Sequence, residues 1–161
     1  MVKDVWDMIE DVREKGQLRR RVIKKKGSFV IIQTSEEDPF FFLDMGPYLV
    51  SREVRRELEI AITSTSDYLW YLVYDGDVLI AFAALEMGEP MLLRHAYVSP
   101  DYRENGLYKR LLDIRLSEAK RMNAKTVRVT AGPLTVEMFK ESQFDLVKTR
   151  GKYKVYEKRL S

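Results

Sequence analysis

The residues best suited to chemistry lie in a polar turn that joins an apolar run to an amphipathic one. The run MLLRHAYV ends just before Pro100, the turn carries Arg103 and Gly106, and the amphipathic run begins at Leu107. This order predicts a strand, a short loop and the start of a helix. The first amides of a helix lack carbonyl partners and lie at the positive end of its dipole, and glycine lets backbone approach a ligand closely. The turn is therefore a candidate anion site, to which Arg103 adds a fixed positive charge.

Two side chains near this turn could accept a proton. His95 lies in the apolar run, three residues before Val98, and the ordinary pKa of a histidine suits proton removal at neutral pH. Glu86 lies near the end of the preceding apolar run and would need a raised pKa or a relaying water to act as a base. A lone histidine on a strand is more often a packed residue than a catalyst, so the sequence leaves both roles open.

The composition excludes several classes of site. The chain has 161 residues, no cysteine and a single histidine, which rules out a thiolate nucleophile, a disulfide framework and a cysteine-ligated zinc. We expect no metal. The first residues are rich in acids and lack the apolar core of a signal peptide, and no apolar run has the length of a membrane span. These features predict a cytoplasmic protein that does not enter a membrane.

One domain, residues 1–161, is expected from the length. Residues 1–27 combine a predicted amphipathic helix over 3–15 with the basic run LRRRVIKKK, which supplies Arg19–Arg21 and Lys24–Lys26. Such a run can attract the phosphates of a nucleic acid. It contains no aromatic residue for base stacking, and most basic runs are solvated edges, so nucleic-acid binding is possible here but not favoured.

The middle of the chain alternates between helical and extended patterns. Residues 29–34 read as a buried strand, and 51–63 read as an amphipathic helix with Val54, Leu58 and Ile62 on one stripe. Between them, Phe40, Phe41, Phe42 and Tyr48 cluster among prolines and glycines, as core or as a substrate pocket. Three consecutive aromatic side chains cannot all face one way, so at least one should be partly exposed.

The C-terminal part predicts a sheet covered on both faces. Two apolar strands within 67–87 meet at Asp75-Gly76, a strong hairpin signal, and a third strand covers 91–98. A helix from Leu107 to about Asn123 follows, with Leu107, Leu111, Ile114 and Leu116 on its buried side. Its length lets the next strand, 126–131, run parallel to the one before. A short helix over 135–142 and a hairpin turning at Arg150-Gly151 end the chain.

A family resemblance rests on these elements and on the turn. The pattern V-x-P-x-x-R-x-x-G-L-x-x-x-L, with Val98, Pro100, Arg103, Gly106 and Leu111, resembles the pyrophosphate loop of the GNAT superfamily of N-acyltransferases. The order of elements over 68–160 is similar to the core of that family. The resemblance implies an α/β (mixed α+β) fold of three layers, in which a central, mostly antiparallel mixed sheet of six to seven strands lies between helices.

The resemblance also implies the site. The acyl-CoA would lie between the strand before the loop and the strand after it, and the expected coenzyme-binding residues are Ala96, Tyr97, Val98, Arg103, Glu104, Asn105, Gly106, Leu107 and Tyr108. The candidate catalytic residues are His95, Glu86 and Tyr108. The family often places a proton-donating tyrosine in a Y-x-x-x-G-F motif, where this chain has Phe139 and Gln143. Tyr108 also replaces the second small residue of the family loop.

Three functions follow as hypotheses. The first is transfer of acetyl from acetyl-CoA, or of another acyl group, to a primary amine of a small molecule or protein. The second is an enzyme of this fold that modifies a DNA base or a charged tRNA, which the basic run favours. The third is a coenzyme A-binding module with little catalysis, which Phe139 favours. A homodimer paired through terminal strands is possible, because the last hairpin has an exposed edge.

Overall fold

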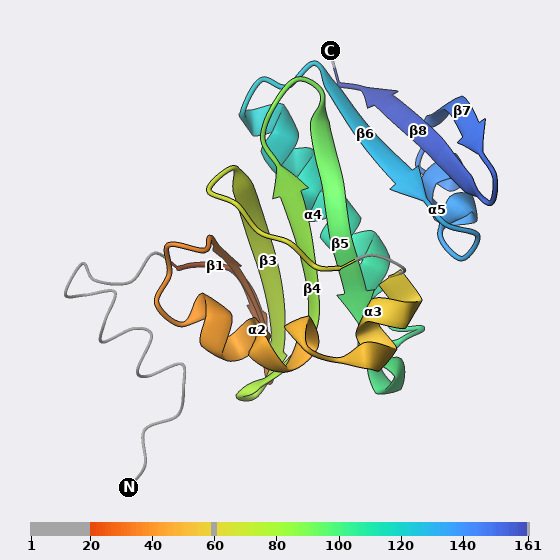
Figure 1. Cartoon of the computed structure of the whole chain (residues 1–161). Coiled ribbons are helices and arrows are strands. Elements are labelled where there is room, and N and C mark those ends of the chain that lie inside the picture. The colour runs from red at the N-terminus through yellow and green to blue at the C-terminus, as the bar shows by residue number, and fades with distance from the viewer. Residues whose placement is uncertain (1–19, 59–60, 161) are drawn as a thin grey trace, which may run out of the picture.

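The computed structural model describes residues 20–58 and 61–160, so the helix expected over 3–15 and the basic residue Arg19 lie outside the described residues (Figure 1). The strands are β1 (Arg21–Lys26), β2 (Phe29–Thr34), β3 (Tyr68–Asp75), β4 (Val78–Glu86), β5 (Met91–Val98), β6 (Thr126–Ala131), β7 (Asp145–Arg150) and β8 (Tyr153–Arg159). The helices are α2 (Phe41–Leu49), α3 (Arg52–Leu58), α4 (Leu107–Arg121) and α5 (Val136–Glu141), with a 3-10 turn at Pro100–Tyr102. None of the helices in the described ranges is long and apolar enough to cross a membrane.

One sheet of eight strands runs through the molecule in the order β1-β2-β3-β4-β5-β6-β8-β7. Every pair is antiparallel except β5 and β6, which the crossover through α4 makes parallel, as the sequence predicts. The expectation of six to seven strands was too low. The strand that it missed is β1, because a segment with four basic residues in six lacks the apolar pattern of a strand.

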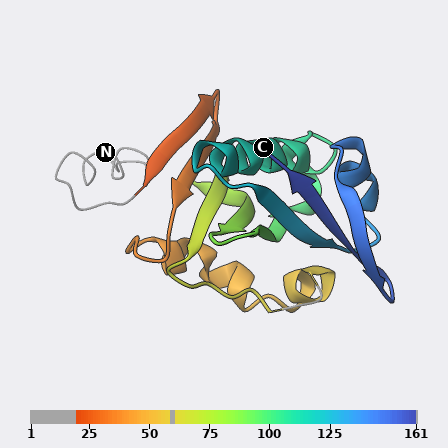
Figure 2. The same ribbon diagram turned by 90° about the horizontal axis from the view of Figure 1, so that it is seen from above.

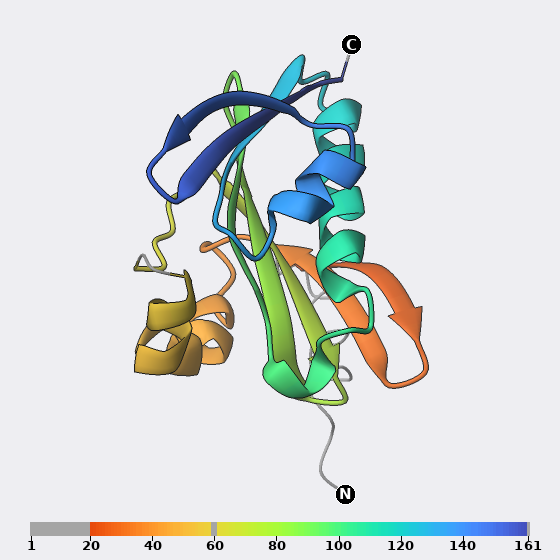
Figure 3. The same ribbon diagram turned by 90° about the vertical axis from the view of Figure 1, so that its right-hand side faces the viewer.

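Helices cover both faces of the sheet, which confirms the three layers (Figure 3). On the face of α2 and α3, aromatic residues such as Trp70, Phe82 and Tyr97 form one buried cluster. On the face of α4 and α5, smaller aliphatic side chains such as Leu111 and Val127 form the other. The central strands contribute to both clusters and are therefore apolar on both faces.

The helix expected over 51–63 is shorter in the structure. The described part of it is α3, Arg52–Leu58, and residues 61–65 have no regular structure. Serine and threonine account for this, since their side chains favour bonds outside a helix. The Ser64 hydroxyl accepts from the Trp70 indole N–H at 3.0 Å, and the Thr63 amide approaches a ring nitrogen of His95.

The aromatic cluster after β2 forms helix α2. Phe41 is fully buried against Trp70, with ring centroids 5.2 Å apart, whereas the Phe42 side chain projects outward and is 54% exposed. The expectation that one of the three phenylalanines is partly exposed is confirmed. These rings belong to the core and its edge.

The buried side of α4 differs from the expected stripe. Leu111 is fully buried, but Leu107, Ile114 and Leu116 are only partly buried, while Leu112 and Arg115 are fully enclosed. The Arg115 guanidinium donates to the carbonyl of Ala84 at 3.1 Å and to that of Leu111 at 3.1 Å. Burial lowers the pKa of Arg115 to about 10. An arginine in an amphipathic helix is expected on the exposed face. Here Arg115 is buried instead, because two backbone carbonyls accept hydrogen bonds from its guanidinium.

Candidate active site

The N-terminus of α4 is an open set of backbone donors. Gly106 is its N-cap, with φ +73° and no side chain bonded to the first turn. The Gly106 carbonyl accepts from the Arg110 amide at 3.0 Å, so the amides of residues 107–109 precede the first helical hydrogen bond. A Cβ at Gly106 would meet nothing within 4 Å, so the positive φ, rather than lack of space, favours glycine. This corner has the donors and the dipole that an anion needs.

Strand β5 separates from β6 just before that corner. The two strands pair only at Met91 with Val127 and at Leu92 with Arg128, although β5 continues to Val98. Within β5, His95 has φ +49°, and the pairing with β4 slips there by one residue. This is a β-bulge, which bends a strand and re-aims its groups. Beyond the bulge the edge of β5 that faces β6 has no strand beside it.

Side chains bond the main chain of Val98 at this unpaired edge. The Arg103 Nε–H donates to the Val98 carbonyl at 2.9 Å. Burial raises the pKa of Tyr108, the nearby Glu57 carboxylate raises it further, and a hydrogen bond to the backbone of Val98 opposes the rise. Arg103 and Tyr108, which precede and follow Gly106, are therefore both within reach of the strand.

Glu57 of α3 is a site residue that sequence reasoning missed. Its carboxylate accepts from the Arg103 guanidinium at 2.6 Å, and the guanidinium also lies over the Tyr97 ring, 5.7 Å from its centroid. Burial and then Glu57 raise the pKa of Tyr97. Only the contact across the layers identifies Glu57, because its local sequence, REVRREL, reads as an ordinary charged helix. The expected role of Arg103 on a diphosphate stays a prediction, since its guanidinium is engaged here.

His95 lies on the face of α2 and α3, packed among aromatic rings. It is 8% exposed and stacks on Trp70 at 5.9 Å with an interplanar angle of 6°. Its Nε2 is 3.4 Å from the amide and the hydroxyl of Thr63, whereas its buried Nδ1 has no partner among the described residues. Burial, with a smaller effect of Arg94, lowers the pKa of His95 to about 4. The ring is therefore neutral at physiological pH and is a weak base.

Glu86 lies at the end of β4, where β5 pairs with it. Its carboxylate accepts from the Arg94 guanidinium at 3.3 Å, and both side chains are partly exposed. Because Arg94 also acts on His95, the two proton-accepting candidates are coupled through one cation. Glu86 is thus linked to the residue next to His95 in the chain.

The remaining expected residues lie around the same corner. Tyr97 stacks on Phe82 at 5.5 Å and holds the α2–α3 face of the strand, while Ala96 lies on the α4 face. Asn105 donates to the Tyr102 carbonyl at 3.2 Å, and the exposed Glu104 has φ +69°. Leu107 packs on the α4 core. In the described parts of the chain, no cluster of three or more acid, histidine or cysteine side chains could hold a metal ion.

Phe139 of α5 supplies no hydroxyl. It is 4% exposed and packs against Phe144 and Tyr156, with centroids 5.2 and 6.3 Å away. The Tyr156 hydroxyl is buried and has no hydrogen-bond partner among the described residues. It was not a sequence candidate, because nothing in the pattern of β8 distinguishes it from a core tyrosine.

Comparison with known proteins agrees with this arrangement. The strand order, the separation of β5 from β6 and the loop before α4 define an acyltransferase of the GNAT type. A sequence model described as an acetyltransferase (GNAT) domain matches residues 46–154, and the chain belongs to this family. No curated protein shows significant sequence similarity to the chain.

Solved structures share the fold at low sequence identity. An acetyltransferase from Streptococcus agalactiae 2603 has a TM-score of 0.66 at 11% identity, covering 84% of this chain and 100% of that one. A GNAT-family acetyltransferase from Staphylococcus aureus Mu50 has a TM-score of 0.64 at 14% identity, covering 83% and 99%. A GNAT-family acetyltransferase from Elizabethkingia anophelis, solved with acetyl-CoA bound, has a TM-score of 0.60 at 12% identity, covering 84% and 100%.

Proposed function

We propose that the protein transfers the acetyl group of acetyl-CoA directly to a primary amine of a small molecule or protein. The observation that carries this proposal is the open N-terminus of α4 beside the unpaired edge of β5. Family membership supports an acyltransferase, and the acetyl-CoA in the Elizabethkingia structure supports the choice of coenzyme.

The donor set at the corner fits a diphosphate. The amides of residues 107–109 would hold its oxygens, and the glycine at position 106 leaves their approach clear. Arg103 would join them by leaving Glu57, and both side chains of this pair are partly exposed. The unpaired β5 edge beyond the bulge would bond the pantetheine arm through backbone groups of Ala96–Val98.

When bound, acetyl-CoA supplies a thioester carbonyl as the electrophile. The Val98 N–H would stabilise the negative charge that develops on the carbonyl oxygen. Tyr108 keeps its phenolic proton at neutral pH, since its pKa is raised, and it lies against the Val98 backbone. It is therefore our proposed proton donor to the departing thiolate, in place of the absent tyrosine at position 139.

The acceptor amine must lose a proton before it attacks. His95 sits on the α2–α3 side of β5, but it is only 8% exposed and stacks on Trp70, so an amine or a water has little access to it. Glu86 is a carboxylate, is partly exposed and is linked to the same Arg94. We therefore assign proton removal to Glu86 acting through a relaying water, and keep His95 as the alternative.

The test separates coenzyme binding from catalysis. Calorimetry measures the affinity of the corner for coenzyme A. Release of free thiol from acetyl-CoA with a panel of amines measures acetyl transfer. Tyr108→Phe should lower kcat by about a hundredfold or more while leaving coenzyme affinity within about twofold, because general-acid catalysis depends on the hydroxyl alone. Equal turnover in Tyr108→Phe would remove that role. Glu86→Gln and His95→Gln, compared for the acid limb of kcat/KM, identify the base.

A coenzyme A-binding module with little catalysis is the second candidate. Phe139 favours it, because its ring is fixed in the core and brings no proton donor to the site. In that case the coenzyme binds but no amine in the panel releases thiol above the background rate.

A further inference from the structure

A basic groove lies on the side of α4 away from β5 and β6. It is the space between β1 and α4, has a volume of about 690 Å³ and is lined by residues of both elements. Figure 2 and Figure 3 show the β1–β2 hairpin standing beside α4, and the groove lining runs along this helix from Gly106 to Arg121. Asn105 and Gly106 also line the groove, so it adjoins the corner at the start of the helix.

The groove carries an excess of positive charge. Five basic side chains line it, Arg21, Lys24, Lys109, Arg110 and Arg121, against two carboxylates. Each carboxylate already has a basic partner on α4: Asp113 lies 2.6 Å from Lys109, and Glu118 lies 2.5 Å from Arg121. Arg21, Lys24 and Arg110 have no ion pair within the described residues.

These three cations stand on two walls. Arg21 and Lys24 come from β1, and Arg110 comes from the first turn of α4. Each wall also contributes an isoleucine to the lining, Ile23 from β1 and Ile114 from α4. A second hollow of about 310 Å³ shares Arg21 and extends toward Gln33 and Ser35 at the end of β2. Like charges that outnumber the counter-charges around them favour an anion that bridges them.

We propose that this groove binds the phosphodiester backbone of a nucleic acid. Its concave shape, with cations on both walls, suits a chain of phosphates better than a flat lipid surface. The aromatic residue in the lining, Tyr71, is fully buried, which predicts backbone contacts without base stacking, and hence little sequence preference. The proposal goes beyond amine acetylation and does not rest on it, because binding is measured without acetyl-CoA.

Salt dependence of binding is the direct test. The probes are a fluorescently labelled single-stranded RNA and a DNA of the same sequence, each also annealed to its complement, followed by anisotropy. Three phosphate contacts predict a loss of affinity of roughly 20- to 40-fold between 50 and 200 mM salt, from the slope of about 0.7–0.9 per contact. The four probes show which source of phosphodiester the groove prefers.

Matched variants tie the binding to the groove. Arg21→Gln with Arg110→Gln should reduce the magnitude of the salt slope by about two. The control is Lys148→Gln with Arg150→Gln, which removes the same charge from exposed positions of β7 at the opposite edge of the sheet. It should change neither slope nor affinity. Asp113→Asn, which removes an acid from the groove, should tighten binding about two- to threefold.

Several results would overturn the proposal. One is absence of binding at 50 mM salt, and another is an equal loss in the β7 control, which would mean that net charge alone acts. A third is binding to phosphatidylserine vesicles, but not to nucleic acid, that the groove variants abolish. The last is a loss of coenzyme A affinity in those variants with nucleic-acid binding unchanged, which would assign the groove to the coenzyme and leave the proposed acetyl transfer intact.

Discussion

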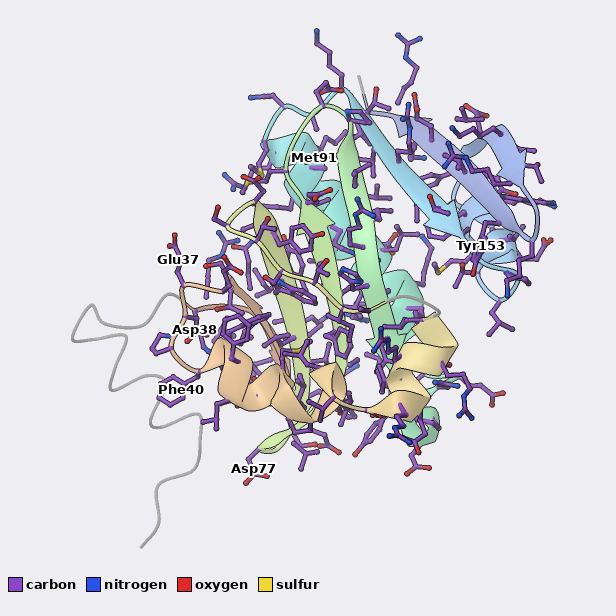
Figure 4. All side chains as sticks on the ribbon, viewed as in Figure 1. Glu37, Asp38, Phe40, Asp77, Met91 and Tyr153 are labelled. Carbon is purple, nitrogen blue, oxygen red and sulfur yellow. The ribbon has the colours of Figure 1, made fainter. Side chains whose placement is uncertain are left out.

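Two polar regions of the molecule differ in how completely their polar groups are hydrogen-bonded. The first, which we call the ionic cluster, lies near the start of β1 and the start of α2. It consists of Arg20, Asp38, Asp44 and Tyr74. The Arg20 guanidinium donates to Asp38, to Asp44 at 2.7 Å and to the Tyr74 hydroxyl at 3.2 Å. Asp38 also accepts from Thr34 at 2.7 Å and from the Phe40 amide at 2.9 Å. Figure 4 shows Asp38 beside Phe40 in the loop before α2.

The second region is the corner between β5 and α4. There the first-turn amides have no cap, a bulge places His95 at positive φ, and its buried Nδ1 lacks a partner among the described residues. The contrast helps to distinguish polar groups that stabilise this fold from polar groups that are available to a ligand. A saturated buried network fixes the chain, whereas open donors and backbone strain cost stability that a bound ligand would offset.

The largest expected effect comes from breaking the saturated region. Arg20→Met leaves the carboxylate of Asp38, 1% exposed, without its cation, and removal of one partner from a buried pair costs about 3–5 kcal/mol. Urea denaturation measures the free energy of unfolding. The control is Arg128→Met, which breaks the more exposed pair with Glu157 and should cost at most about 1 kcal/mol. Equal losses in the two variants would mean that the ionic cluster is not the stronger constraint.

The next effect concerns the pH dependence of stability. The pKa of His95 is about 4 in the folded protein against an ordinary value of 6.5, so below pH 6.5 the unfolded chain binds the proton more readily. The free energy of unfolding should therefore fall as the pH is lowered from 6.5 toward 4, by about 1.4 kcal/mol per unit of pKa difference at most. His95→Gln should flatten this fall relative to the parent. Denaturation at pH 7.0 and 5.0 measures it, and identical pH slopes in both proteins would contradict a neutral buried ring.

The corner itself is tested by Gly106. Gly106→Val places a β-branched residue at φ +73° and puts its side chain over the open amides, so coenzyme A affinity should fall at least tenfold, which is about 1.4 kcal/mol. Calorimetry measures affinity, and denaturation measures the strain. Gly106→Asn is the matched control, because asparagine tolerates this backbone conformation. If the Asn variant folds like the parent but still binds weakly, obstruction is the cause. Unchanged affinity in both variants would show that the corner does not hold the coenzyme.

The regions also differ in how far the sequence predicts them. The strand-to-helix turn is predictable because Gly106 and the amphipathic run mark a local structure, and the hairpin at Asp75-Gly76 is equally local. Glu57, Arg115 and Tyr156 are not predictable, since their significance depends on neighbours from other elements. Strand β1 was not predicted, because its backbone pairing with β2 outweighs a basic composition. Local backbone geometry can thus be predicted from the sequence, whereas contacts between side chains of different elements cannot.

The smallest expected effect concerns the ion pair between Arg103 and Glu57. It tests whether this pair opposes coenzyme binding at the corner. Arg103 donates to Glu57 at 2.6 Å in this structure, and a role on the diphosphate requires it to leave. Glu57→Gln keeps the shape but removes the charge, so coenzyme A should bind about two- to fivefold more tightly, as expected for a partly exposed pair of under 1 kcal/mol. Arg103→Ala should weaken binding both in the parent and in the Glu57→Gln variant. If Glu57→Gln instead weakens binding, the carboxylate positions Arg103 for the ligand, and the pair belongs to the assembled site rather than restraining it.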